Sequence, residues 1–202
     1  MSQGQSKSWQ PAVGIPNDSK PTALFALAKP NVGLGVILVV LGMLFFLLFI
    51  TYASRMQLGD WHPLPEPRIL WLNTVLLVFS SCAFRWAKLA WSRSAIHTVY
   101  KTLLAAGILA FLFLAGQLLA WQQIRSSGYL LEGNPATSFF YLITLVHGLH
   151  VAAGLVAWFR TWVRFVRGNS VLGIRIGIEL CALYWHFLLV VWLIFYGLML
   201  ST

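Results

Sequence analysis

The sequence predicts an all-α integral membrane protein: a bundle of five transmembrane helices, with the amino terminus in the cytoplasm and the carboxyl terminus outside. Hydrophobic residues make up 59% of the 202 residues and charged residues only 9%, against roughly 25% charged residues in soluble domains. This composition excludes a water-soluble core with a polar shell. Five long apolar stretches and a biased distribution of lysine and arginine are the other two observations behind the prediction.

An apolar helix of about 20 residues suffices to cross a hydrocarbon core about 30 Å thick. The first and third stretches, from Pro30 to Ser54 and from Thr102 to Ile124, contain no charged residue. The second is shorter, but Arg85 and Lys88 at its end can extend their charged groups toward the headgroups. We therefore predict spans at about 33–54, 69–89, 101–123, 137–160 and 179–200.

The segments outside the spans fix the expected organisation and orientation. Residues 1–30 are rich in proline and small polar residues, which predicts a flexible cytoplasmic arm before a transmembrane domain at 31–202. Eleven of the 14 lysines and arginines lie in this arm and in the second and fourth connections, whereas Arg55, Arg68 and Arg125 lie on the other side. Basic residues mark the cytoplasmic side of a membrane protein. The net charge of +9 thus reflects membrane topology, and we do not expect nucleic acid as a partner.

Polar side chains inside the last two spans are the candidate site. His147 and His150 lie three residues apart, and Glu179 and His186 lie seven apart, so each pair shares one face of its helix. An imidazole facing lipid would have unsatisfied ring nitrogens, so all three histidines are expected to point inward. The pattern allows a buried site between the two helices.

The spacing of the histidines is weak evidence for a metal or haem site. A haem b would need facing imidazoles, which His186 with His147 or His150 could supply in principle. Di-iron membrane enzymes use several short histidine boxes, and a single H-x-x-H falls well short. A structural hydrogen-bonding role is therefore the default interpretation of these residues.

Close packing and interhelical hydrogen bonds hold membrane helices together. Asn73, Thr74 and Gln117 are the polar residues expected to bridge helices. Small residues expected to allow close backbone approach are Gly33, Gly35 and Gly42 in the first span, and Gly148 with Ala152 and Ala153 with Ala157 in the fourth. Tryptophans expected at the membrane interfaces are Trp61, Trp71, Trp91, Trp121, Trp162 and Trp185.

The last two spans also carry a family resemblance. The string HGLHV, which includes His147, Gly148 and His150, precedes Gly154 and the basic segment from Arg160 to Arg167. Glu179 then lies seven residues before the histidine of YWHF, which holds Trp185 and His186, and VVW follows. This arrangement resembles subunit III of the haem-copper respiratory oxidases, in a five-helix bacterial form, over about residues 33–200.

The resemblance implies a subunit of a cytochrome c or quinol oxidase of the bacterial plasma (inner) membrane. The complex would reduce O2 to water in aerobic respiration while pumping protons. This chain would hold no haem, copper or catalytic residue. It would pack against subunit I, with subunit II and further respiratory subunits in the same assembly, stabilise subunit I during turnover, and guide O2 through bound phospholipid.

Two positions depart from the family pattern, and one segment suggests a lipid site. Many members have a glutamate at the position of Gly42 and an aspartate where this chain has Leu188 and Leu189, so proton relay through those carboxylates is disfavoured here. Arg164 and Arg167 occupy positions where members place residues that bind phospholipid headgroups, although plain positive-inside charge explains them equally well. Seven-helix members enclose a lipid cleft, and a chain with five helices would lack one wall of it.

Three other functions remain as alternatives. Within the family, the chain would be an accessory subunit of a nitric oxide reductase. Outside it, the alternatives are a bis-His membrane cytochrome b and a small transporter subunit. A transporter more often shows internal repeats and helix-breaking residues at mid-span, and no proline lies inside these spans.

Overall fold

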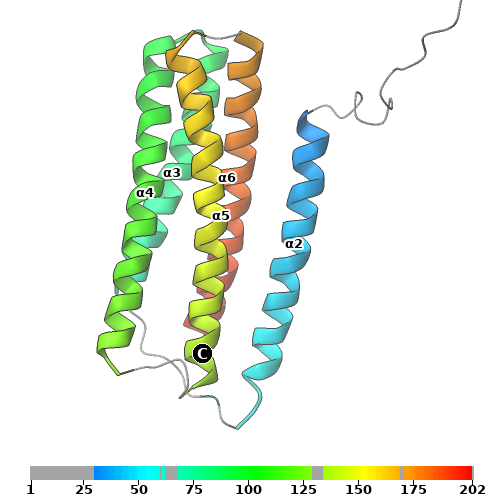
Figure 1. Ribbon diagram of the computed structural model, residues 1–202, viewed down its shortest axis with the longest axis vertical. Helices are drawn as coiled ribbons and strands as arrows, with labels where there is room; N and C mark the ends of the chain where they lie inside the picture. Colours follow the sequence, from blue (N-terminus) through cyan, green and yellow to red (C-terminus); the bar gives the residue numbers. More distant parts are fainter. Residues whose placement is uncertain (1–29, 60, 62–67, 129–133, 169–170, 202) are drawn as a thin grey trace, which may run out of the picture.

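The computed structural model describes residues 30–59, 61, 68–128, 134–168 and 171–201, and these form five helices (Figure 1). The helices are α2 (Pro30–Arg55), α3 (Ile69–Ser92), α4 (Ile96–Ser126), α5 (Pro135–Val166) and α6 (Val171–Leu200). Each is long and apolar enough to cross a membrane. The predicted five-helix membrane fold is confirmed. The predicted arm at 1–30 lies outside the described residues except for Pro30.

The helices extend beyond the predicted spans, most of all at the start of α6. The last span was predicted from residue 179, but α6 begins at Val171, and α3 and α4 are separated only by Arg93–Ala95. Six of the eight basic residues assigned to the second and fourth connections therefore lie within helices, and only Arg93 and Arg167 lie outside them. The reason is physical: an apolar run measures the hydrocarbon core, whereas backbone hydrogen bonding continues into the headgroup region, where charged side chains remain solvated.

Local sequence explains where several helices begin and end. The side chain of Asn134 accepts a hydrogen bond from the Ala136 amide at 3.0 Å, and Pro135 occupies the first turn of α5. This is the usual chemistry of a helix start. Gly128 and Gly168 follow the ends of α4 and α5 with φ of 86° and 63°, a conformation that glycine adopts without steric cost.

Helices α3 to α6 form a four-helix bundle, and α2 lies beside it against α6 and α5 (Figure 1). The bundle core contains the fully buried side chains of Trp185, Trp192, Phe84 and Phe113. In contrast, only 6% of the most apolar stretch of α2 is buried. The outer face of α2 is therefore available to lipid or to another subunit.

Four glycines provide the closest contacts between helices. A Cβ added to Gly107 would lie 2.1 Å from the Trp158 ring, and one added to Gly154 would lie 2.7 Å from the Trp185 ring. Gly116 and Gly177 are equally restricted, by the side chains of Asn73 and Thr161. Gly33 and Gly35 of the first span have no neighbour within this chain, since a Cβ added to either would meet nothing within 4 Å.

Side-chain hydrogen bonds connect every neighbouring pair within the bundle. Among them are Ser80 Oγ to Ala106 O (α3–α4), Trp158 Nε1 to Leu103 O and Trp121 Nε1 to Thr144 Oγ1 (α4–α5), Trp192 Nε1 to Thr74 Oγ1 (α3–α6), and Tyr184 OH to His150 O (α5–α6). Thr74 thus bridges helices as expected. The side-chain amides of Asn73 and Gln117 are buried and have no hydrogen-bond partner within the described residues.

Candidate functional site

His147 lies in the centre of the bundle and is enclosed by aromatic rings. It is only 1% exposed. Its ring centroid lies 5.2 Å from that of Trp192 on α6, 5.8 Å from Phe113 on α4 and 6.3 Å from Phe45 on α2. The imidazole therefore contacts three other helices, and the prediction of an inward-pointing side chain is confirmed. The predicted hydrogen-bonding role was wrong for His147, because neither of its ring nitrogens has a hydrogen-bond partner within the described residues and its contacts are with aromatic rings.

His150 lies one turn further along α5 and links it to two neighbours. Its Nδ1 donates a 2.7 Å hydrogen bond to the Val146 carbonyl, and its ring packs against Phe45 at 5.3 Å. Its backbone carbonyl accepts the hydroxyl of Tyr184 from α6 at 3.0 Å. The side chain is half-buried, and one of its ring nitrogens is bonded to its own helix.

His186 is held in the same way on α6. Its Nδ1 donates to the Ala182 carbonyl one turn earlier, and the side chain is half-buried. A histidine that bonds its own helix in this way satisfies a polar group in an apolar setting. The three histidines therefore have different surroundings: His147 is enclosed by aromatic rings, whereas His150 and His186 are each hydrogen-bonded to a backbone carbonyl.

Trp185 lies at a close contact between α5 and α6. It is fully buried, its ring centroid lies 4.5 Å from that of Phe84 on α3 with the two rings tilted, and it fits against Gly154. We predicted an interfacial position for it, and this was wrong because α6 starts eight residues before Glu179. At Gly148, one of the predicted points of close approach, an added Cβ would meet only Leu114, at an ordinary contact distance of 3.7 Å.

Glu179 forms an ion pair with Arg175 one turn earlier. The Nε of Arg175 donates to Oε1 of Glu179 at 3.1 Å, and the two side chains are 62% and 32% exposed. Because α6 begins at Val171, Glu179 lies two turns inside the helix and is not a helix-start carboxylate. Such an exposed pair contributes little to stability.

Arg164 and Arg167 lie at the end of α5, with exposed side chains. Arg164 belongs to the last turn and Arg167 is the C-cap. This end of the bundle also bears the last turns of α3 and the first turns of α4 and α6. Both arginines are therefore placed among many other basic side chains.

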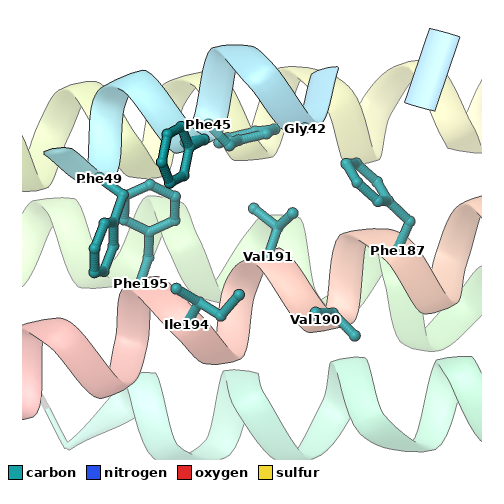
Figure 2. A pocket seen from close by; sticks show the side chains of 9 residues that line it. Gly42, Phe45, Phe49, Phe187, Val190, Val191, Ile194 and Phe195 are labelled. Carbon is teal, nitrogen blue, oxygen red and sulfur yellow. The ribbon is translucent and has the colours of Figure 1, made fainter. Parts of the chain in front are cut away.

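A groove between α2 and α6 marks the position where a family glutamate is replaced by Gly42 (Figure 2). It has a volume of about 390 Å³, and the side chains around it are phenylalanine, valine and isoleucine. The nearest atom to a Cβ on Gly42 would be in the ring of Phe187, at 3.8 Å. Leu188 is buried in the core and Leu189 packs against it. Both departures from the family pattern thus fall in apolar surroundings.

The chemistry of these residues is that of packing. Within the described ranges, no three histidine, cysteine, aspartate or glutamate side chains gather as metal ligands would. Phe45, Phe113 and Tyr184, which contact the histidines, were not predicted as site residues, and neither was Trp192 of the VVW string. Its spacing of seven residues from Trp185 was the one signal that both indoles share a helix face.

Comparison with known proteins adds a second line of observation. A family model described as cytochrome c oxidase subunit III matches residues 25–201. The chain is 29% identical over 190 residues to a probable cytochrome c oxidase subunit 3 of Mycobacterium tuberculosis, covering 90% of this chain and 94% of that protein. Cytochrome c oxidase subunit 3 of Corynebacterium diphtheriae is 26% identical over 193 residues, with the same coverage. That of Synechocystis is 28% identical over 176 residues, covering 86% of this chain and 70% of the relative.

Proposed function

The chain belongs to the cytochrome c oxidase subunit III family, and from this premise we propose that it is a non-catalytic subunit that binds and stabilises subunit I. As a subunit III of a haem-copper oxidase, it is a multi-pass membrane protein and part of an oxidase complex. The matches do not favour a nitric oxide reductase subunit, a cytochrome b or a transporter. Electron transfer, O2 reduction and proton pumping are activities of the complex.

The state of the histidines supports a structural role. His147 is surrounded by rings from three helices, and His150 and His186 each donate one ring nitrogen to a carbonyl of their own helix. A ring nitrogen bonded to its own helix is satisfied within the apolar surroundings, and the imidazole of His147 joins α5 to three other helices through ring contacts. The proposal therefore assigns no haem, copper or catalytic residue to this chain and expects the haem and copper in partner subunits.

The exposed apolar face of α2 supports a large partner in the membrane. Val39, Met43 and Phe46 are 73%, 66% and 62% exposed, and a helix that contacts so little of its own chain has surface for another subunit. Guidance of O2 through bound phospholipid stays a prediction; the apolar groove between α2 and α6 is where it would be sought. We also propose the bacterial plasma membrane as the location.

Purification of the complex through a tag on this chain tests the role. We expect a haem- and copper-containing subunit I to co-purify in equal amount, and the separated chain to show no Soret band. Removal of the chain should leave the haem spectrum of subunit I intact but shorten the time for which the enzyme stays active during turnover. A stoichiometric Soret band on the separated chain, or recovery without any redox partner, would contradict the proposal.

The orientation, with the amino terminus inside, is a further part of the proposal. Basic residues concentrate at the end of the bundle that holds the α3–α4 and α5–α6 turns, and this end should face the cytoplasm. In a background with Cys82 and Cys181 replaced by alanine, a Ser126→Cys variant should react with an impermeant maleimide in spheroplasts. A His97→Cys variant, at the other end of α4 and equally exposed, should react only after permeabilisation. The reverse pattern would invert the topology.

A further inference from the structure

A pocket with charged walls lies between α3 and α6, away from the histidines. It has a volume of about 460 Å³, within the range of small-ligand sites. Its lining comes from the last turns of α3 and the second and third turns of α6: Lys88, Leu89, Trp91, Ser92, Arg175, Ile178 and Glu179. None of the interhelical hydrogen bonds described above uses these side chains.

The pocket presents an excess of positive charge from two helices. The ammonium group of Lys88 has no ion pair within the described part of the chain. Arg175 donates only its Nε to Glu179, so the terminal nitrogens of its guanidinium remain donors for another acceptor. Two cations and one carboxylate give a net charge of +1. A small anionic group is the ligand chemistry that this arrangement favours.

The depth of the pocket matches the level of lipid phosphates. The 24 residues of α3 span about 36 Å at 1.5 Å per residue, which exceeds a hydrocarbon core of about 30 Å by roughly one turn. Lys88 lies four residues before the end of α3, and Arg175 lies four residues after the start of α6. Both cations therefore lie at the boundary between hydrocarbon and headgroups, and Trp91 is of the residue type enriched there.

The walls suit an amphiphile better than a free ion. Leu89, Ile178 and the indole of Trp91 supply apolar surface next to the two cations. A lipid can place its phosphate against the charges and its glycerol and upper acyl carbons against these side chains, whereas inorganic phosphate would leave the apolar walls without contact.

We propose that this pocket binds the phosphate group of a membrane phospholipid through Lys88 and Arg175. The site differs from the headgroup position suggested at Arg164 and Arg167, which lie on α5 and outside this lining. Glu179 has a positioning role, because its carboxylate holds Arg175 at the pocket wall through Nε. The lipid thereby joins the ends of α3 and α6.

The test uses the intact oxidase complex in nanodiscs and phosphatidylglycerol with a photoreactive headgroup. Crosslinks should map to the peptides that contain residues 88–92 and 175–179. Lys88→Gln and Arg175→Gln should each raise the half-saturating lipid concentration about fivefold. The double variant should weaken binding more than either single variant but depart from the product of the two effects, because both cations bind one phosphate. Lys88→Gln keeps the Arg175–Glu179 pair, so its effect is free of any change in that contact.

Matched control variants distinguish lipid binding at this pocket from general attraction of anionic lipid to the basic end of the bundle. Arg93→Gln and Arg164→Gln remove exposed cations at the same end of the bundle that do not line the pocket, and neither should change the crosslinking at these peptides. Equal weakening by the controls would show diffuse attraction and overturn the proposal. Displacement of the probe by equimolar inorganic phosphate would overturn the lipid assignment. Retention of the chain in the complex, measured on the same samples, distinguishes loss of lipid from loss of assembly.

Discussion

Replacing Trp192 with alanine is expected to lower the free energy of unfolding by about 3–5 kcal/mol, the usual loss when a buried tryptophan is truncated. The indole is 1% exposed. It stacks on Tyr196 at 6.1 Å, meets Phe113 edge-on at 5.3 Å and lies 5.2 Å from His147. Truncation would leave a cavity at the point where α3, α4, α5 and α6 meet. Unfolding of the purified chain in mixed micelles, followed by far-UV circular dichroism during a dodecyl sulfate titration, measures the loss.

The hydrogen bond of Trp192 can be separated from its packing. Trp192→Phe keeps most of the ring contacts but removes the Nε1 donor that bonds Thr74 Oγ1 at 2.9 Å. We expect a loss of about 1 kcal/mol, typical of interhelical hydrogen bonds in membranes. Thr74 still donates to Leu70 O at 2.8 Å, so its hydroxyl keeps a partner. A phenylalanine variant as unstable as the alanine variant would show that the hydrogen bond, and not the packing, holds α6 to α3.

The number of helices and their membrane-spanning character could be predicted from the sequence, because the length of each charge-free apolar run decides both. A charge-free run of about 20 residues has no stable position except across the bilayer, and every predicted span corresponds to a helix. The residues at which the helices begin and end were predicted less accurately. Arg175 and Glu179 ended the apolar run, but both lie within α6, where their charged groups reach the headgroup region and pair with each other.

The contacts between helices could be predicted only in part. Thr74 bridges α3 and α6, yet the neighbouring Asn73 instead packs its amide against Gly116. Gly33 and Gly107 are the same residue in similar apolar settings, but one faces open space and the other faces Trp158. Which face of a helix is covered depends on the rotation of every neighbour, and the weak amphipathicity of buried membrane helices does not report it.

The family motif predicted where His147 lies in the bundle but did not predict which side chains contact it. His147 was expected to point inward, and it does. The rings that enclose it come from α2, α4 and α6, more than 30 residues away in sequence on each side. The charged pocket between α3 and α6 could not be foreseen for the same reason, since Lys88 and Arg175 are brought together only by the packing of two helices distant in the chain.

Gly154→Ala should be the most damaging single-methyl insertion in α5. The added Cβ would lie 2.7 Å from Cζ3 of Trp185 and 2.8 Å from Cε1 of Tyr184, distances that real Cβ contacts do not reach. Trp185 has little room to move away, because it is fully buried and its ring centroid lies 4.5 Å from that of Phe84. Overpacking of this kind costs about 1–3 kcal/mol, and the hydrogen bond from Tyr184 to the His150 carbonyl should weaken with it. The same dodecyl sulfate titration measures the change.

Gly148→Ala is the matched control, with the same substitution on the same helix. Its Cβ would meet Leu114 at 3.7 Å, so we expect no loss and a gain of up to about 1 kcal/mol from the better helix propensity of alanine. Trp185→Phe removes the ring atoms that obstruct the new methyl group. Combined with Gly154→Ala, it should therefore give a smaller loss than the sum of the two single variants. Strictly additive losses, or equal damage by the two alanine variants, would mean that the α5–α6 contact does not depend on the fit between Gly154 and Trp185.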